Sequence, residues 1–356
     1  MTQEGQKLAS GSAAGAYRLR ARRLGIDSQY EAIVYMRADC HVCRAEGFAA
    51  HNRVRLTNGD RSIIATLHHV TGALLLEDEA GLSESAWHRL GLHADGLIAV
   101  NHPEPLESLG KVRGKVYGRP LDQADLDAIV TDVVGGRYSD IHLSSFITAC
   151  AARPLDLAET IALTRAMTQA GDQLSWPMRP IADKHCVGGL PGNRTTPIVV
   201  AIAAACGLVM PKTSSRAITS PAGTADAMET LAPVDLDIPA MRRVVEREGG
   251  CVVWGGAVRL SPADDTLIRV ERALDLDSEG QLVASVLSKK VAAGSTHLVL
   301  DLPVGPTAKV RSDTAAAALS QSLAAVARAF GLETRIVTTD GSQPVGRRVT
   351  PHLRCR

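Results

Sequence analysis

The chain has 356 residues, 45% of them hydrophobic and 3% aromatic, and its formal net charge is +1 at pH 7. This length is sufficient for two or three domains. A charge near zero gives no electrostatic basis for binding nucleic acid or an acidic membrane surface, and so few aromatic residues argue against a base-stacking surface. No apolar run approaches the roughly 20 residues of a membrane span. We therefore expect a globular protein that binds neither nucleic acid nor a membrane.

Seven cysteines are scattered along the chain, at positions 40, 43, 150, 186, 206, 251 and 355. An odd number without regular spacing is typical of reduced thiols, not of a disulfide framework. The N-terminal segment also lacks the apolar stretch of a secretory signal. Together these features predict a cytoplasmic protein.

Residues 17 to about 93 alternate between polar and apolar side chains, as β-strands do. Within this region, residues 58–60 (Asn-Gly-Asp) lie between two such runs and predict a hairpin turn. We expect a small β-rich N-terminal domain over residues 1–93, followed by a proline-bearing linker.

The same region contains a Cys-His-Val-Cys motif, formed by Cys40, His41 and Cys43. With His51 these side chains are a candidate zinc site, and the two cysteines alone are a candidate redox pair. A zinc site normally has a second pair of ligands at a definite spacing, and none follows here. We favour a structural role for both thiols and predict no metal.

The next segment carries two helix-start signals. Asp122 precedes apolar residues that recur at helical spacing as far as a pair of glycines. Asp156 and Glu159 have the spacing of a capping box. We expect a helical domain over residues 105–172.

From about residue 176, apolar strands alternate with helices. Residues 297–305 have the composition of a buried strand, residues 312–331 have helical periodicity, and residues 334–341 read as a second strand. A strand, a helix and a second strand in this order predict a parallel β-sheet. We assign residues 176–356 to an α/β domain.

Residues 183–197, DKHCVGGLPGNRTTP, combine groups that bind an anion. Lys184 supplies a full positive charge, and the glycines let a ligand approach the backbone. The two threonines and Pro197 predict a helix start, whose N–H groups and partial positive charge attract phosphate. The motif is neither a Walker A loop nor a dinucleotide fingerprint. A tight turn with a solvated lysine is the alternative.

A second hydroxyl-rich stretch, residues 211–231, contains Arg216 and precedes a predicted helix. Two such loops, each beside a helix and each with a cation, predict one oxyanion site. A third stretch holds Ser285 and Lys289, which are four residues apart and therefore share a helix face. Lys290 then points elsewhere, and we expect it to be solvated.

These three stretches resemble the thymidine phosphorylase family, also called pyrimidine-nucleoside phosphorylases. The resemblance is to the long-form branch, which includes AMP phosphorylases, and it covers residues 17–347. It implies a nucleoside phosphorylase/phosphoribosyltransferase-like α/β fold: a helical domain and a mixed α/β domain, preceded by the small β-rich domain. The family is typically dimeric through its helical domain, so a homodimer is expected.

The resemblance also implies roles for individual residues. Phosphate binding is implied for Lys184, Cys186, Thr196, Ser214 and Thr224. Catalytic roles are implied for Asp277 as proton donor and for His185 and Lys289 beside the base. Substrate contacts are implied for Gly189, Ser215, Arg216, Ala217, Ile218, Thr219, Ser220, Ser285 and Lys309. Cys186 stands where the family usually has serine, and a thiol is a weaker donor.

The implied reaction is phosphorolysis: phosphate attacks C1′ of a nucleoside such as thymidine and the base leaves. Inorganic phosphate is a co-substrate, and no metal or other cofactor is needed. Residues 219–224 differ from the turn of thymidine-specific members, and Arg269 and Arg272 straddle the position of their base-reading arginine. The substrate is therefore a nucleoside or a nucleoside monophosphate, with AMP phosphorolysis to ribose 1,5-bisphosphate as the alternative.

Two further classes stay open. Anthranilate phosphoribosyltransferases have a related fold, but the acidic pair that would hold their magnesium is not evident in this sequence. The chain also ends in GRRVTPHLRCR, where the family continues into a C-terminal domain. That ending suggests a truncated or frame-shifted product, which would keep the fold as a non-catalytic binding protein.

Overall fold

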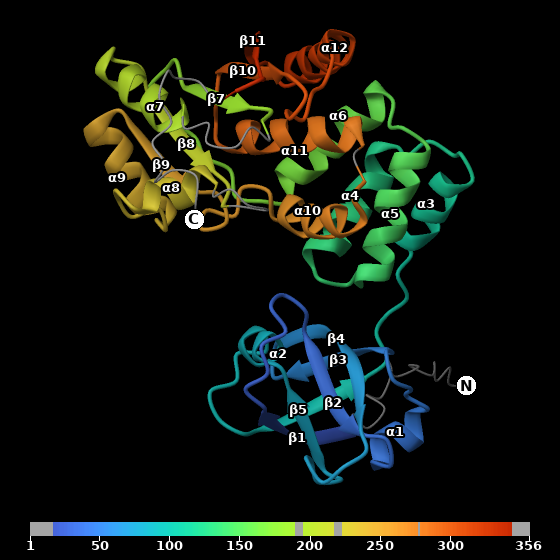
Figure 1. Cartoon of the computed structure of the whole chain (residues 1–356). Helices are drawn as coiled ribbons and strands as arrows, with labels where there is room; N and C mark the ends of the chain where they lie inside the picture. Colours follow the sequence, from blue (N-terminus) through green and yellow to red (C-terminus); the bar gives the residue numbers. More distant parts are fainter. Residues whose placement is uncertain (1–16, 189–194, 217–222, 277, 344–356) are drawn as a thin grey trace, which may run out of the picture. The chain divides into compact units, whose positions relative to one another are not determined.

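The computed structural model describes residues 17–188, 195–216, 223–276 and 278–343, and the structural statements below concern these residues. The chain divides into two compact units, Met1–Leu106 and Glu107–Arg356. Figure 1 labels the helices and strands of both units.

The first unit contains a closed six-stranded barrel with the strand order β1-β5-β2-β4-β3-β6. Its strands are β1 (Tyr17–Arg23), β2 (Ile33–Arg37), β3 (Arg53–Asn58), β4 (Arg61–Val70), β5 (Glu79–Leu82) and β6 (Leu97–Asn101). β1 is parallel to β5 and β2 to β4, and the other pairs are antiparallel. The hairpin predicted at residues 58–60 is confirmed, because Asn58 pairs with Arg61 and Gly59 has φ of 57°.

Alternate side chains of the barrel strands point inward and form its core. Leu19, Val34 and Leu56 are completely buried there. Two short helices, α1 (His41–Glu46) and α2 (Glu84–Arg89), accompany the strands. Cys40 caps α1 and belongs to the same core as Cys43, so both thiols are enclosed by apolar side chains.

The second unit begins with helices. These are α3 (Ser108–Val116), α4 (Gln123–Val134), α5 (Asp140–Ala152) and α6 (Leu157–Gln169), and α10 (Pro262–Leu274) and α11 (Glu279–Ala292) pack against them. Both predicted helix starts are confirmed. Asp122 accepts a hydrogen bond from the backbone of α4, and Asp156 and Glu159 form the capping box of α6.

The remainder of the second unit is an α/β region. Its strands are β7 (Ala182–Cys186), β8 (Met210–Ser214), β9 (Gly250–Trp254), β10 (His297–Val304) and β11 (Glu333–Asp340). Its helices are α7 (Thr195–Ala205), α8 (Thr224–Glu229), α9 (Ile238–Glu248) and α12 (Asp313–Ala329). The predicted strand-helix-strand unit is confirmed, since β10 and β11 are parallel and α12 connects them.

The strands of this region form two small parallel sheets, β11-β10-β7 and β8-β9. Among the described residues, one isolated bridge between Ile181 and Val209 connects them. The predicted fold class, a helical domain followed by a mixed α/β domain, is confirmed. None of the helices in the described ranges is long and apolar enough to cross a membrane.

Candidate active site

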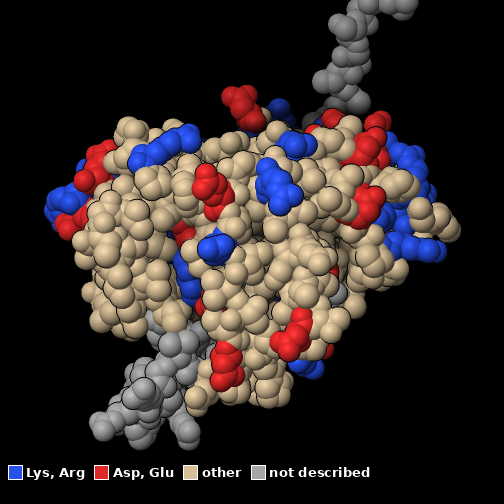
Figure 2. All heavy atoms as spheres, turned by 90° about the horizontal axis from the view of Figure 1, so that it is seen from above, with Lys and Arg blue, Asp and Glu red and all other residues tan. Residues whose placement is uncertain are grey.

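The candidate site lies where β7 and β8 separate. The two strands are joined at Ile181 and Val209, and beyond this bridge β7 pairs with β10 whereas β8 pairs with β9. Ligands of α/β proteins bind outside the carboxyl ends of strands that separate in this way. On the face of the second unit seen in Figure 2, Lys or Arg and Asp or Glu side chains lie together in a furrow. We call the space at the carboxyl ends of β7 and β8 the crevice.

Lys184, on β7, connects three elements at the crevice. Its ammonium donates a hydrogen bond of 2.8 Å to Thr195 Oγ1, at the start of α7, and lies 3.3 Å from Asp301 Oδ2 on β10. The side chain is buried, and so is the neighbouring Thr196. A lysine ammonium is thus held beside the first turn of α7, which is the arrangement expected for binding an anion.

Cys186 ends β7 as a neutral thiol. Burial raises its pKa to about 12, and the nearby carboxylate of Asp301 acts in the same direction, while Lys184 opposes it. A thiolate here would repel phosphate, so the raised pKa is compatible with the phosphate contact that the sequence implies.

His185 shows how the basic side chains are arranged. Its pKa is lowered well below the usual value, first by burial and then by the positive charges of Lys290, Lys212, Lys289 and Lys184. Four lysines from three elements therefore act electrostatically on this imidazole. The ring is neutral at physiological pH, so it can orient a base by hydrogen bonding but does not carry the extra proton that a general acid releases.

Ser214, Ser215 and Thr224 lie around the end of β8. The carbonyl of Ser214 accepts a hydrogen bond from the Gly255 N–H at 2.9 Å. The carbonyl of Ser215 accepts one from the Ala225 N–H at 3.2 Å, which attaches the loop to the first turn of α8. Thr224 is the first residue of α8.

Arg216 is engaged by acidic side chains. Its guanidinium lies 2.5 Å from Glu229 Oε2 and 3.3 Å from Asp226 Oδ1, and it stacks 4.8 Å from the centre of the Trp254 ring. A substrate phosphate would have to compete with both carboxylates for this arginine.

Ser285 and Lys289 share a face of α11, as predicted: the Lys289 ammonium donates to Ser285 Oγ at 3.4 Å. It also forms an ion pair with Asp264, from α10. The expectation that Lys290 is solvated is wrong. Lys290 is 2% exposed, and its ammonium lies 3.0 Å from Asp183 Oδ2, because a buried carboxylate requires a cationic partner.

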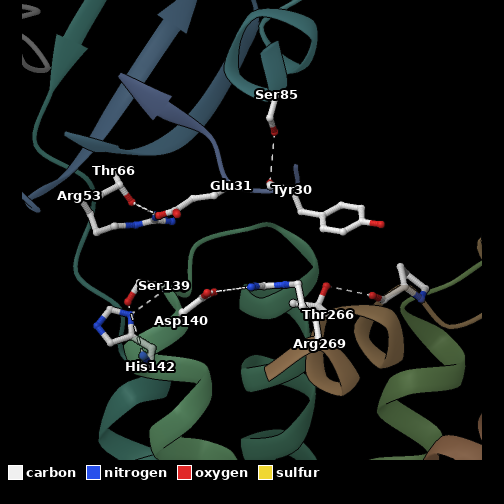
Figure 3. A network of polar contacts seen from close by, with 11 residues as sticks. Tyr30, Glu31, Arg53, Thr66, Ser85, Ser139, Asp140, His142, Thr266 and Arg269 are labelled. Atoms are coloured by element: carbon white, nitrogen blue, oxygen red, sulfur yellow. Dashed lines mark hydrogen bonds and ion pairs between the residues drawn. The ribbon is translucent and has the colours of Figure 1, made fainter. Parts of the chain in front are cut away.

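Two more candidate residues are placed by their contacts. The backbone N–H of Lys309 donates to the Gly188 carbonyl at 3.0 Å, so this loop adjoins the glycine-rich segment. Arg269 forms a two-point ion pair with Asp140, at 2.8 and 2.5 Å (Figure 3). This arginine, one of the two that straddle the base-reading position, is thus bound to α5.

Some implied residues cannot be placed. Gly189, Ala217, Ile218, Thr219, Ser220 and Asp277 lie outside the described residues. In the described ranges, no three His, Cys, Asp or Glu side chains are grouped in a way that could hold a metal ion.

Sequence reasoning missed three buried charges next to the implied site, Asp183, Lys212 and Asp264, and the partly buried Asp301. A signal for Lys212 was present, because it interrupts an apolar strand. A lysine inside a buried strand requires a partner, and that partner is Asp183.

The fold and the crevice define a class of protein, the glycosyl transferases that consist of a helical bundle and an α/β domain. Residues 111–171 match the family described as "Glycosyl transferase family, helical bundle domain". Residues 178–355 match the family described as "Glycosyl transferase family, a/b domain".

Similar proteins narrow this class. A protein of Polaromonas sp. strain JS666, named "Putative thymidine phosphorylase", is 63% identical over 340 residues, which are 96% of this chain and 66% of that protein. A similarly named protein of Acidovorax sp. strain JS42 is 65% identical over 339 residues, 95% of this chain and 66% of that protein. The chain belongs to the thymidine phosphorylase family. It spans just under two thirds of the length of these relatives.

A solved structure supports the fold. Anthranilate phosphoribosyltransferase from Thermus thermophilus is similar with a TM-score of 0.53 and 24% identity, over 66% of this chain and 67% of that one. At this identity the likeness concerns the fold and not the reaction.

Proposed function

We propose that this chain is a nucleoside phosphorylase of the thymidine phosphorylase type, a pentosyltransferase that converts thymidine and phosphate into thymine and 2-deoxyribose 1-phosphate. The observation that carries the proposal is geometric: Lys184 lies beside Thr195 at the first turn of α7, and Lys289 with Ser285 shares one face of α11. The names of the similar proteins point to the same reaction. The proposed reaction uses inorganic phosphate and no other cofactor.

Phosphate would bind at the carboxyl ends of β7 and β8. Lys184 would supply a charge-assisted contact, Thr196, Ser214 and Thr224 would donate hydroxyl hydrogen bonds, and Cys186 would add a weaker donor. A phosphate oxygen held in this way attacks C1′ while the bond from C1′ to the base nitrogen breaks. The bonding electrons leave with the base, so positioning and charge stabilisation supply most of the catalysis.

The base would lie against the face of α11 that carries Ser285 and Lys289. Lys289 would stabilise the negative charge that grows on the departing base, and its ion pair with Asp264 holds the ammonium in position. His185, as a neutral imidazole, would orient the base. Asp277 would deliver the proton, as the family resemblance implies.

AMP phosphorolysis is the second candidate. The exposed side chains of Ser215 and Lys309 favour it, because they adjoin the loops in which AMP phosphorylases contact their nucleotide. Arg216 counts against it, since Glu229 and Asp226 already neutralise its guanidinium. We therefore place the nucleoside first.

We also propose that two copies form a homodimer through the helical domain. Val116, Ile141, Ser144, Thr148 and Ala152 help to line a surface groove of this domain, and Ile141 is 80% exposed. Apolar and small side chains grouped on exposed helices are typical of a surface that another protein covers.

A base-release screen tests the proposed activity. The purified chain is incubated with thymidine, uridine, AMP, CMP or UMP, with and without phosphate, and the free base is measured. Release of thymine that requires phosphate supports the proposal. Consumption of a pyrophosphate-activated sugar with no release of base would indicate a phosphoribosyltransferase. Phosphate binding without turnover of any substrate would indicate a binding protein.

A further inference from the structure

Three charged side chains are enclosed where β7, β8 and α11 meet: Asp183, Lys212 and Lys290, each at most 4% exposed. The Asp183 carboxylate lies 3.0 Å from the Lys290 ammonium and, through its other oxygen, 3.6 Å from the Lys212 ammonium. We call these residues the buried triad. No role in the proposed reaction has been given to it so far.

The buried triad adjoins all three groups of proposed site residues. Asp183 precedes Lys184 on β7, Lys290 follows Lys289 on α11, and Lys212 lies two positions before Ser214 on β8. The members of the triad therefore connect the three backbone segments that carry the phosphate and base contacts.

Lys212 crosses the gap between the two sheets. Its side chain extends from β8 to Asp183 on β7, beyond the Ile181–Val209 bridge, where the backbones of β7 and β8 are no longer paired in the described residues. Its ammonium also donates to the Thr213 carbonyl at 2.5 Å. These two contacts fix the end of β8 relative to β7.

The charges of the buried triad do not balance, because two ammonium groups share one carboxylate. Burial lowers the pKa of Lys212 to about 7; Asp183 opposes this shift, and Lys290 adds to it. A buried cation without its own counter-charge is costly. An anion at the nearby carboxyl ends of the strands would supply the missing negative charge.

We infer that Lys212 is a positioning residue for phosphate: with Asp183 and Lys290 it fixes the spacing of β7, β8 and α11, and its positive charge favours an anion in the crevice. This inference rests on the proposed function, since it takes the crevice to be the phosphate site. A bound anion stabilises the protonated form of Lys212, so anion affinity decreases as the pH rises through about 7.

Other groups around Lys212 do not produce this pH dependence. In the described part of the chain, the titratable groups that face it come from β7, β9 and α11: Asp183, His185, Cys251 and Lys290. Burial raises the pKa of Cys251 to about 12, far above the range of interest, and burial together with the nearby lysines lowers the pKa of His185 well below its usual value, away from pH 7. The pKa of Asp183 is lowered by its two lysines against the effect of burial. α7 has no ionisable side chain, and α9 buries Met241 and Val245.

The experiment measures sulfate binding by isothermal titration calorimetry between about pH 6 and about pH 8.5. Sulfate is the probe because its charge does not change in this range, whereas that of phosphate does. The variant is Lys212→Met, which removes the charge but leaves Asp183 paired with Lys290. The control is Lys115→Met, which removes another buried lysine, one that pairs with Glu159 in the helical domain.

The inference predicts that sulfate affinity of the unmodified chain falls about tenfold across this range. Lys212→Met binds about tenfold more weakly at pH 6 and shows no such fall, whereas Lys115→Met keeps it. The inference is overturned if the sulfate affinity of the unmodified chain does not change with pH, or if Lys212→Met shows the same fall. The first of these outcomes can be measured even if the variant does not fold. If sulfate binds as predicted but no base is released in the screen, the proposed function is refuted and the inference stands. If base is released but Lys212→Met binds sulfate with the same affinity and pH dependence as the unmodified chain, the inference is refuted and the proposed function stands.

Discussion

At the scale of single residues, the crevice depends on buried lysines that differ in their partners. Lys184 has Asp301 and the hydroxyl of Thr195 within reach, whereas Lys212 shares Asp183 with another lysine. A lysine with a carboxylate and a hydroxyl around it is held in one direction, which is what a contact to substrate requires.

Replacing Lys184 by alanine is expected to abolish most phosphorolysis. The loss of a charge-assisted contact to phosphate costs about 1.5–3 kcal/mol, which corresponds to roughly a tenfold to hundredfold fall in kcat/KM for phosphate. Lys111→Ala is the control, because Lys111 is a partly exposed lysine of the helical domain. An unchanged kcat/KM for phosphate in the folded Lys184→Ala protein would contradict the assignment.

The cysteines give a second prediction at this scale. The described cysteines that are buried are Cys40, Cys43, Cys150 and Cys251, and Cys206 is exposed. A hydrogen bond with Cys43 lowers the pKa of Cys40 to about 6, yet both sulfurs lie in the barrel core and a reagent cannot reach them. We expect an aromatic disulfide reagent to modify Cys206 in the folded Cys355→Ser chain and to spare these four.

A chelator is likewise expected to change neither the melting temperature nor the activity. Stoichiometric zinc in protein purified without added metal, lost together with stability on chelation, would show that Cys40 and Cys43 are ligands instead.

How a residue behaves could be predicted from the sequence where its partners are close in the chain. Ser285 and Lys289 share a face because they are one helical turn apart. Lys290 was misjudged because its partner, Asp183, is more than a hundred residues away and belongs to another element. Arg216 and its partner Glu229 are 13 positions apart, and their contact depends on how α8 folds back toward the end of β8. The sequence alone therefore did not reveal it.

At the scale of elements, α3 and α6 are joined through Glu159. Its carboxylate accepts hydrogen bonds from Lys115 Nζ at 2.7 and 2.8 Å, from the Leu121 N–H at 2.8 Å and from the Asp156 N–H at 3.0 Å. One buried carboxylate thus completes the capping box of α6 and neutralises a buried lysine of α3.

Glu159→Gln is expected to lower the free energy of unfolding by about 3 kcal/mol, because the Lys115 ammonium remains buried without a counter-charge. Glu248→Gln is the matched control: Glu248 pairs with Arg247, both are exposed, and the change should cost less than about 0.5 kcal/mol. Equal effects of the two substitutions in urea denaturation would show that the buried pair contributes no more than a surface pair.

The elements that the sequence predicted correctly are those with local signals. Asp122, Asp156 and the hairpin glycine act within a few residues of themselves, so their effect is visible in the sequence. The parallel pairing of β1 with β5, and the separation of β7 from β8, depend on contacts between distant segments. No local pattern encodes such contacts.

At the scale of the whole molecule, the proposed function distinguishes a nucleoside from a nucleotide as substrate. Comparison of kcat/KM for thymidine and AMP on one preparation tests this distinction. We expect thymidine to be preferred, because Arg216 is occupied by carboxylates. A preference for AMP of about a hundredfold, roughly 2.7 kcal/mol of differential transition-state binding, would reverse the order of the two candidates.

The proposed homodimer gives a further prediction. Ile141→Asp places a charge in the exposed apolar surface of α5 and is expected to convert the dimer into a monomer, measured by light scattering after gel filtration. Tyr30→Asp, at an exposed position of the barrel unit, should leave the mass unchanged. A monomeric unmodified chain, or a dimeric Ile141→Asp variant, would contradict the use of this surface.

The pairing of β7 has a consequence for the order in which the protein folds during synthesis. All strands of the barrel lie between residues 17 and 101, so that unit can close soon after it leaves the ribosome. The strand that carries Lys184 pairs along its length with β10, whose first residue, His297, comes more than a hundred positions later. Until then β7 exposes unpaired backbone, and closing so long a loop is slow. The nascent crevice therefore stays incomplete, with an unpaired strand edge, until β10 has been synthesised.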